Sequence, residues 1–140
     1  RLMQEMILGI GGVKLLKELN IVPNLYHMNE GHSAFLIIEL IEQIMREKEV
    51  SFEVAKELVK TMTAVTVHTP VPAGNEIFDI DLIERMFDGK WDELGISKDT
   101  FLRLGMTPND NYKKAFNMGV FALKIAGKKN GVSKLHRRCF

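Results

Sequence analysis

Cysteine is nearly absent from this 140-residue chain: the single residue of this type is Cys139, beside the C-terminus. One cysteine excludes an intrachain disulfide framework and a cysteine-rich zinc site, and it fits a reducing cytoplasm best. Neither charge is in excess, with 19 Lys and Arg against 18 Asp and Glu. A balanced charge excludes long-range attraction to nucleic acid, membrane surfaces or acidic partners.

Long apolar runs are absent too. The run over residues 6–13 resembles the apolar part of a secretory signal, but Lys14, Lys17 and Glu18 continue it as an amphipathic helix without a small-residue cleavage site. No stretch approaches the roughly 20 apolar residues of a membrane-spanning helix. We therefore predict a soluble, cytoplasmic protein without a targeting signal. Because the chain opens with Arg1 inside this helical pattern, we expect its N-terminus to be a cut.

Hydrophobic residues make up 46% of the chain, which is enough to build a core at this length. Apolar periodicity predicts a helix over residues 2–19, a largely buried helix over 32–48, and a surface helix that begins at the N-cap Ser51. Short β-strands are predicted over 25–28, which we expect to be buried, and over 64–67.

Further helices are predicted downstream from their capping residues. Asp79 is expected to cap a helix that ends at Asp88, and Ser97 one that ends at Leu104. Asp110 or Asn111 is expected to open a longer helix over residues 110–127.

The two predicted strands flank two helices, so they are expected to be parallel and joined by a right-handed crossover. Each is followed by polar residues, 29–32 after the first and His68 after the second. These residues should meet at the carboxyl edge of the sheet, where open α/β sheets bind ligands. A histidine after a strand is ordinarily structural, but Pro70 and Pro72 hold the next residues extended and fix how His68 is presented.

Two simpler signals are rejected. Gly9 and Gly11 lie inside a helical pattern, and the third glycine of a dinucleotide fingerprint would fall at Lys14, so we expect close helix packing there instead. His27, Glu30 and His32 suggest a zinc site, but the histidines are not four residues apart and no further ligand is near in sequence. We expect no metal, and no serine or cysteine nucleophile stands in a recognisable elbow.

Four separated motifs resemble, in order and spacing, the α-glucan phosphorylases, in the version of the bacterial and archaeal maltodextrin type. They are HMNEGHSAF (27–35), VHTPVPAG (67–74), FNM (116–118) and NGVSKLH (130–136), and QEMILGIGG (4–12) extends the resemblance to the first residues. The resemblance covers nearly the whole chain, but only a central stretch of the N-terminal half of the family enzyme.

This resemblance implies an α/β fold: a helix-rich fragment of a Rossmann-like domain, with short parallel strands and crossover helices, from a two-domain architecture of the glycosyltransferase B type. Residues 1–140 would form a single partial domain. Residues 137–140 depart from the family pattern, which continues after His136 with a small residue and then commonly an acidic one.

The resemblance also implies an activity. Family enzymes are glycosyltransferases that cleave the terminal α-1,4-linked glucose of a glucan with inorganic phosphate, and pyridoxal phosphate is their cofactor. By match to the family's His-Thr motif, His68 would hydrogen-bond the bound glucose near its 6-hydroxyl group and orient it. Asn29, Glu30 and His32 match a loop beside the same pocket, and Glu30 stands where the animal enzymes have an aspartate.

Several parts of the family site are missing from the sequence. The Schiff-base lysine, the basic residues that grip the phosphates, the asparagine-containing sugar loop and the upstream glycine-rich loop belong to other segments. We therefore expect no cofactor-binding residue in this chain and no bound pyridoxal phosphate.

Two interpretations stay open. One is a fragment of a glucan phosphorylase that is inactive alone and associates with itself. The other is a free-standing, non-catalytic carbohydrate-binding or interaction module. The genomic reading frame separates them: coding sequence that continues on both sides means a fragment, and a natural start and stop codon means a module.

Overall fold

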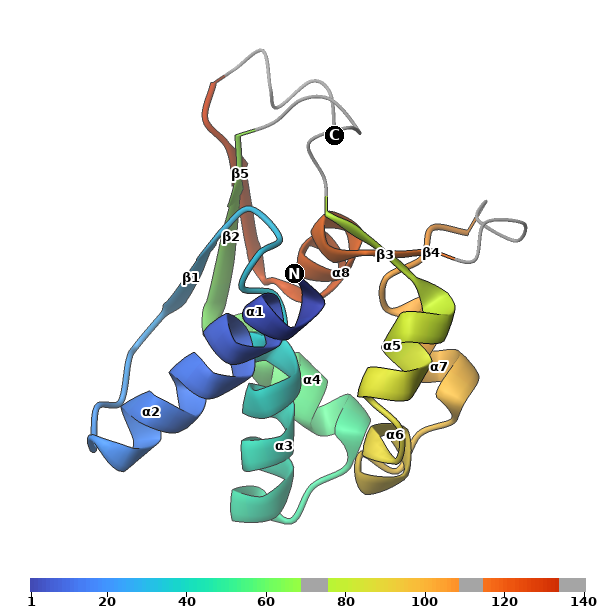
Figure 1. The fold of residues 1–140 in the computed structure, drawn as a ribbon. Coiled ribbons are helices and arrows are strands. Elements are labelled where there is room, and N and C mark those ends of the chain that lie inside the picture. Colours follow the sequence, from blue (N-terminus) through green and yellow to red (C-terminus); the bar gives the residue numbers. More distant parts are fainter. Residues whose placement is uncertain (69–75, 109–114, 134–140) are drawn as a thin grey trace.

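The structure is a computed structural model that describes residues 1–68, 76–108 and 115–133. Its main sheet is parallel, with the strand order β1 (Tyr26–Asn29), β2 (Thr63–Val67) and β5 (Lys128–Gly131). Strands β3 (Ile77–Asp79) and β4 (Ala115–Asn117) form a small antiparallel pair on the other side of the molecule (Figure 1). The expected α/β class and the parallel pairing of the first two strands are confirmed.

The sheet differs from the sequence prediction in two respects. It has a third strand, β5, whose Asn130 lies opposite Thr66 of β2. Its sequence KKNG contains no apolar side chain, so only backbone pairing with β2 marks it as a strand. The expectation of a buried first strand is wrong, because β1 lies at the edge and only Met28 of its four residues is buried. All five residues of β2, the central strand, are buried.

The first helix runs continuously through α1 (Leu2–Met6), the π-helical segment η1 (Ile7–Gly11) and α2 (Gly12–Glu18), as expected. Its buried Gly9 lies against the residues that begin the next helix. A Cβ atom at Gly9 would lie 2.6 Å from the backbone nitrogen of Leu36 and 2.9 Å from the carbonyl oxygen of Ser33. The expected packing role of this glycine is confirmed.

This contact allows a matched pair of substitutions. Gly9→Ala should lower the free energy of unfolding by about 1–3 kcal/mol, because backbone atoms cannot move aside as a side-chain tip can. Gly12→Ala is the control: an added Cβ there meets nothing within 4 Å, so alanine should stabilise the helix by about 0.5–1 kcal/mol. Urea unfolding followed by circular dichroism measures both. Equal effects of the two substitutions would contradict the close packing at Gly9.

Helix α3 (Leu36–Lys48) begins four residues later than predicted, because residues 32–35 form turns before it. Its burial on more than one face is confirmed, with these residues buried: Leu36, Ile37, Ile38, Leu40, Ile41 and Ile44. Helix α4 (Phe52–Thr61) begins at the predicted cap, where the hydroxyl oxygen of Ser51 accepts a hydrogen bond from the backbone nitrogen of Val54 at 3.4 Å.

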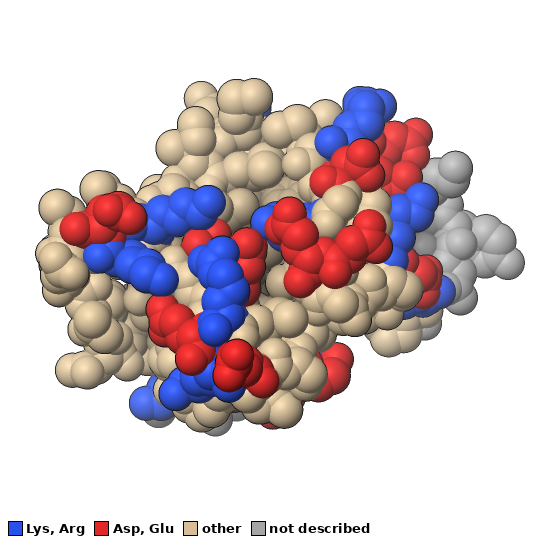
Figure 2. Space-filling view, turned by 90° about the horizontal axis from the view of Figure 1, so that it is seen from below, with Lys and Arg blue, Asp and Glu red and all other residues tan. Residues whose placement is uncertain are grey.

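The second half begins with α5 (Ile80–Met86), α6 (Lys90–Glu93) and α7 (Lys98–Arg103), gathered beside one another in Figure 1. The predicted caps are confirmed: Asp79 accepts from the backbone nitrogen of Asp81 at 2.8 Å, and Ser97 from that of Thr100 at 3.1 Å. No helix in the three described ranges combines the length and apolar character needed to cross a membrane. On the face in Figure 2, acidic and basic side chains are interspersed.

The last predicted helix is partly wrong. Residues 115–117 form β4, and helix α8 (Met118–Ile125) begins only after it. Two features stop the helix from starting earlier: Phe116 pairs with Phe78 of β3, and the side chain of Asn117 accepts a hydrogen bond from the backbone nitrogen of Val120 at 3.0 Å. The predicted first residues, Asp110 and Asn111, lie outside the described residues.

An aromatic cluster joins the two halves. Phe35, just before α3, has its ring centroid 4.9 Å from that of Phe87, 6.2 Å from Phe116 and 6.1 Å from Phe121. Such contacts stabilise a core beyond the area they bury. They anchor the end of the loop that leaves β1.

Candidate functional site

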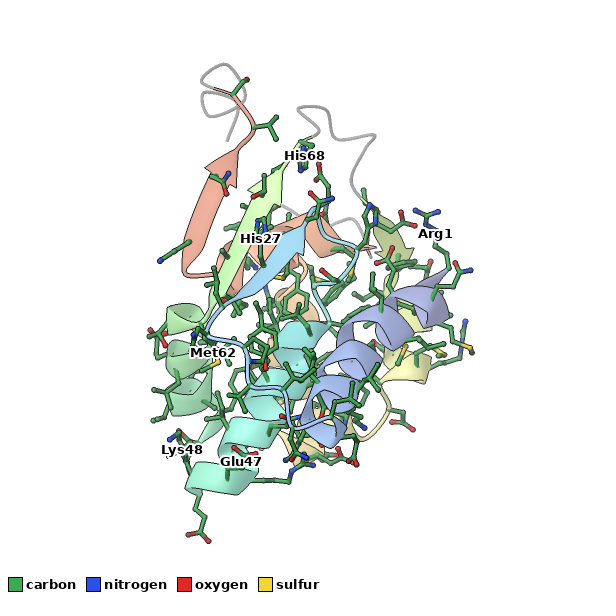
Figure 3. All side chains as sticks on the ribbon, turned by 90° about the vertical axis from the view of Figure 1, so that its left-hand side faces the viewer. Arg1, His27, Glu47, Lys48, Met62 and His68 are labelled. Atoms are coloured by element: carbon green, nitrogen blue, oxygen red, sulfur yellow. The ribbon has the colours of Figure 1, made fainter. Side chains whose placement is uncertain are left out.

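The carboxyl ends of β1 and β2 bring together three of the four predicted site residues. Figure 3 shows His68 just beyond the end of β2 and His27 on β1. The Nε2 atom of His68 lies 2.5 Å from Oδ1 of Asn29, and its backbone nitrogen donates to Oε1 of Glu30 at 2.5 Å. The backbone nitrogen of Glu30 donates in turn to the carbonyl oxygen of Thr66 at 2.9 Å.

These contacts determine how the imidazole of His68 can act. An amide oxygen only accepts hydrogen bonds, so Nε2 of His68 must donate to Asn29. In a neutral imidazole the other nitrogen, Nδ1, is then an acceptor. Asn29 therefore selects the tautomer in which His68 offers a lone pair to a hydroxyl group.

The loop itself is tightly constrained. Glu30 has a φ of 61°, in the left-handed region that non-glycine residues seldom adopt. The next residue, Gly31, is buried, and a Cβ atom there would lie 2.8 Å from the backbone nitrogen of Gly119 in α8. A side chain at position 31 would push the loop away from α8. Strained residues held by their surroundings are common at functional sites.

A second hydrogen-bonded chain crosses all three strands of the sheet. His27 Nε2 lies 2.7 Å from Oγ1 of Thr66, which donates to Oδ1 of Asn130 at 2.8 Å. Because the single hydroxyl proton of Thr66 goes to Asn130, Nε2 of His27 must donate to Thr66. The sequence analysis did not single out Thr66, since a threonine in a strand is ordinary.

His32, the fourth predicted site residue, faces different partners. Its Nδ1 atom lies 3.5 Å from Oε1 of Glu5 in α1, and Glu76 joins this pair. The predicted loop is therefore divided: Asn29 and Glu30 contact His68, and His32 lies with two carboxylates that the sequence did not single out. The trio His27, Glu30 and His32 is not among the possible metal-binding groups that the described residues form.

Glu5 is the most unusual ionisable residue of this region. It is only 4% exposed, and within the described part of the chain neither carboxylate oxygen has a hydrogen-bond partner. Burial raises the pKa of Glu5, and the nearby charge of Glu76 raises it further, against the opposing effects of His32 and Arg1. Sequence reasoning missed Glu5 because a glutamate in an amphipathic helix ordinarily faces solvent.

Two partly buried lysines, Lys56 and Lys90, do not fit pyridoxal phosphate. A Schiff-base lysine must lose its proton, which a buried or cationic setting promotes. Lys56 pairs with Glu53 at 2.6 Å, and Lys90 with Glu42 and Glu93 at 2.9 and 2.5 Å. Burial lowers the pKa of Lys90, but its hydrogen bonds to Glu93 and Glu42 outweigh burial, so the pKa lies above its ordinary value. The amine of Lys90 is therefore held as a cation.

Two stretches on which the sequence prediction relied lie outside the described residues. Pro70 and Pro72 belong to residues 69–75, and the end of the last motif belongs to residues 134–140. The geometry of the candidate site therefore rests on residues 27–32, 66–68 and 130.

Comparison with known proteins agrees with the sequence motifs. The sequence profile of the carbohydrate phosphorylase family matches residues 13–140. The chain is 38% identical over 149 aligned residues to the glycogen phosphorylase of Mycobacterium tuberculosis, covering 99% of this chain and 17% of that protein. It is 41% identical over 138 residues to the maltodextrin phosphorylase of Thermococcus litoralis, covering 99% and 16%.

A third relative, the glycogen phosphorylase of Aquifex aeolicus, is 32% identical over 137 residues, covering 98% of this chain and 20% of that protein. The chain thus spans about a sixth to a fifth of the length of these curated relatives. With a family profile that matches almost from end to end, the chain belongs to the carbohydrate phosphorylase family.

Proposed function

We propose that this chain is a segment of an α-glucan phosphorylase and carries part of the sugar-binding side of its active site. The intact enzyme would transfer the terminal α-1,4-linked glucose of a glucan to inorganic phosphate. Residues 1–140 would be part of one Rossmann-like domain of a two-domain enzyme. Matches to relatives named glycogen and maltodextrin phosphorylase support this proposal.

The observation that carries the site proposal is the double attachment of His68, through Nε2 to Asn29 and through its backbone nitrogen to Glu30. A residue held through both its ring and its backbone loses little freedom when it binds a sugar hydroxyl, so the geometry is prepared in advance. His68 would accept a hydrogen bond from glucose through Nδ1. Asn29 and Glu30 would position it, and His32 would hold the other end of the loop.

The reaction itself would need the rest of the enzyme. Neither Lys56 nor Lys90 fits the cofactor, and no cluster of basic side chains for two phosphates is expected among residues 1–140. The chain alone would therefore bind and orient sugar at most. The transfer of glucose to phosphate would require the segments that hold the phosphates.

A direct test uses the 140-residue chain with maltoheptaose, inorganic phosphate and pyridoxal phosphate. We expect no glucose 1-phosphate and no stoichiometric absorbance band of an internal aldimine. A full-length maltodextrin phosphorylase assayed in parallel is the positive control. A stoichiometric band that a single Lys→Ala substitution removes would show that the cofactor site lies in this chain, contrary to the proposal.

A further inference from the structure

Three side chains converge from separate parts of the fold: Glu5 lies in α1, His32 in the loop after β1, and Glu76 immediately before β3. One carboxylate oxygen from each glutamate and one ring nitrogen of His32 lie within 4.8 Å of one another. Segments from residue 5 to residue 76 of the sequence thus contribute to one cluster.

Glu5 is the feature of this cluster that requires a partner. A carboxylate that is 4% exposed and has no hydrogen-bond partner among the described residues is costly to bury. The available neighbours do not solve this problem. Arg1 pairs with Oε1 of Glu76 at 2.6 Å, and His32 Nδ1 approaches Oε1 of Glu5 only to 3.5 Å, which is long for a hydrogen bond.

We propose that Glu5, His32 and Glu76 bind one divalent transition-metal ion of the zinc class. Each glutamate would supply one oxygen, and His32 would supply Nδ1. A set of one imidazole and two carboxylates suits Zn²⁺ better than Mg²⁺ or Ca²⁺, which prefer oxygen ligands alone. Three protein ligands leave the fourth tetrahedral position open for water.

The cluster is wider than a loaded site and would contract on binding. Zinc bonds of about 2.0 Å place tetrahedral ligands about 3.3 Å apart, so the widest separation would close by about 1.5 Å. His32 can make this movement because its side chain is 41% exposed, whereas that of Glu5 is 5% exposed. The exposed imidazole also gives the ion a path from solvent to the buried carboxylate.

The test is a zinc titration of the metal-free 140-residue chain in competition with a chromogenic chelator. We expect one Zn²⁺ per chain, not displaced by a 100-fold excess of Mg²⁺. Glu5→Gln and His32→Asn should each weaken zinc binding by at least ~100-fold. Even the loss of a residue that only hydrogen-bonds to a metal ligand weakens metal binding about 10–100-fold. The matched controls His27→Asn and Glu57→Gln should bind zinc as the unmodified chain does.

Thermal unfolding supplies a second measurement that does not depend on the chelator. Zinc should raise the Tm of the unmodified chain and of both controls, and should leave that of Glu5→Gln unchanged, because only binding to the folded state stabilises it. Glutamine has nearly the shape of glutamate and removes a buried charge, so this variant should fold, as circular dichroism would verify.

Two outcomes would overturn the proposal. One is the absence of stoichiometric binding, or equal affinity in all four variants, which would place the ion elsewhere. The other is an infrared band of a protonated carboxyl group that Glu5→Gln removes and that saturating Zn²⁺ leaves in place. That result would mean that a proton, and not a metal, neutralises Glu5. Neither outcome bears on the sugar role of His68, which involves other contacts.

Discussion

The substitution His68→Ala, made in a full-length phosphorylase that contains this segment, should lower kcat/KM for phosphorolysis by at least ~100-fold, the scale expected for a lost transition-state hydrogen bond. Asn29 holds the imidazole of His68 in one tautomer, and Glu30 holds the backbone of the same residue. Alanine removes the acceptor that we propose for the glucose hydroxyl. The measurement is the initial rate of glucose 1-phosphate release over a range of glucan concentrations.

Two further variants distinguish a sugar contact from a structural role. His27→Ala removes a histidine of the same sheet that hydrogen-bonds Thr66 instead, so its kcat/KM should change much less. Asn29→Ala should also lower kcat/KM, because the imidazole of His68 would no longer be held in one tautomer. Comparable Tm values for the three variants would exclude unfolding as the cause. Near-normal activity of His68→Ala would end the assignment.

The isolated chain should associate with itself at micromolar concentration. Large apolar side chains are exposed along the outer face of α1 to α2 and in the segment that follows. The most exposed is Val22, at 89%. The other exposed apolar residues of this region include Met3, Ile7, Leu8, Leu15, Leu19, Ile21 and Leu25. In the described chain β1 pairs only with β2, so its outer edge is open beside this face. Open edges and apolar faces are templates for pairing.

The strength of the self-association follows from the apolar area that it buries. At ~25 cal/mol per Å², a few hundred Å² of apolar surface on each partner gives on the order of 10 kcal/mol before the costs of association. With the smallest cost of association, about 4 kcal/mol, about 6 kcal/mol remains, which corresponds to a dissociation constant of tens of micromolar. Sedimentation velocity over a concentration series measures it.

A charge on this face should weaken the association. Leu8→Glu combined with Leu15→Glu should raise the dissociation constant by at least ~100-fold, because burying two leucines contributes about 3 kcal/mol or more. Val54→Glu, at an exposed apolar residue of α4, is the control and should change little. A compact monomer at high micromolar concentration would favour the free-standing module over the fragment.

The sequence predicted much of the local structure because the signals are local. Ser51, Asp79 and Ser97 each begin a helix, since a cap needs only a hydrogen bond to a backbone nitrogen two or three residues away. The parallel pairing of β1 and β2 also followed from the sequence. A crossover through helices brings the chain back to the end of the sheet where the first strand began, so the second strand runs in the same direction.

The missed elements depend on partners that are distant in the sequence. Strand β5 has no apolar residue and exists because its backbone pairs with β2. Strand β4 interrupts a helical pattern because Phe116 pairs with Phe78 and packs among other aromatic rings. Propensity is a weak signal where tertiary pairing competes with it.

The candidate site shows the same division. The sequence alone determined the family, through four motifs in order, and it determined that Asn29, Glu30 and His68 would meet, because parallel strands end at one edge of a sheet. Only the tertiary structure decided that His32 turns from His68 toward Glu5 and Glu76. The burial of Glu5 arises from the packing of α1 and cannot be read from a helical pattern in which glutamate ordinarily faces water.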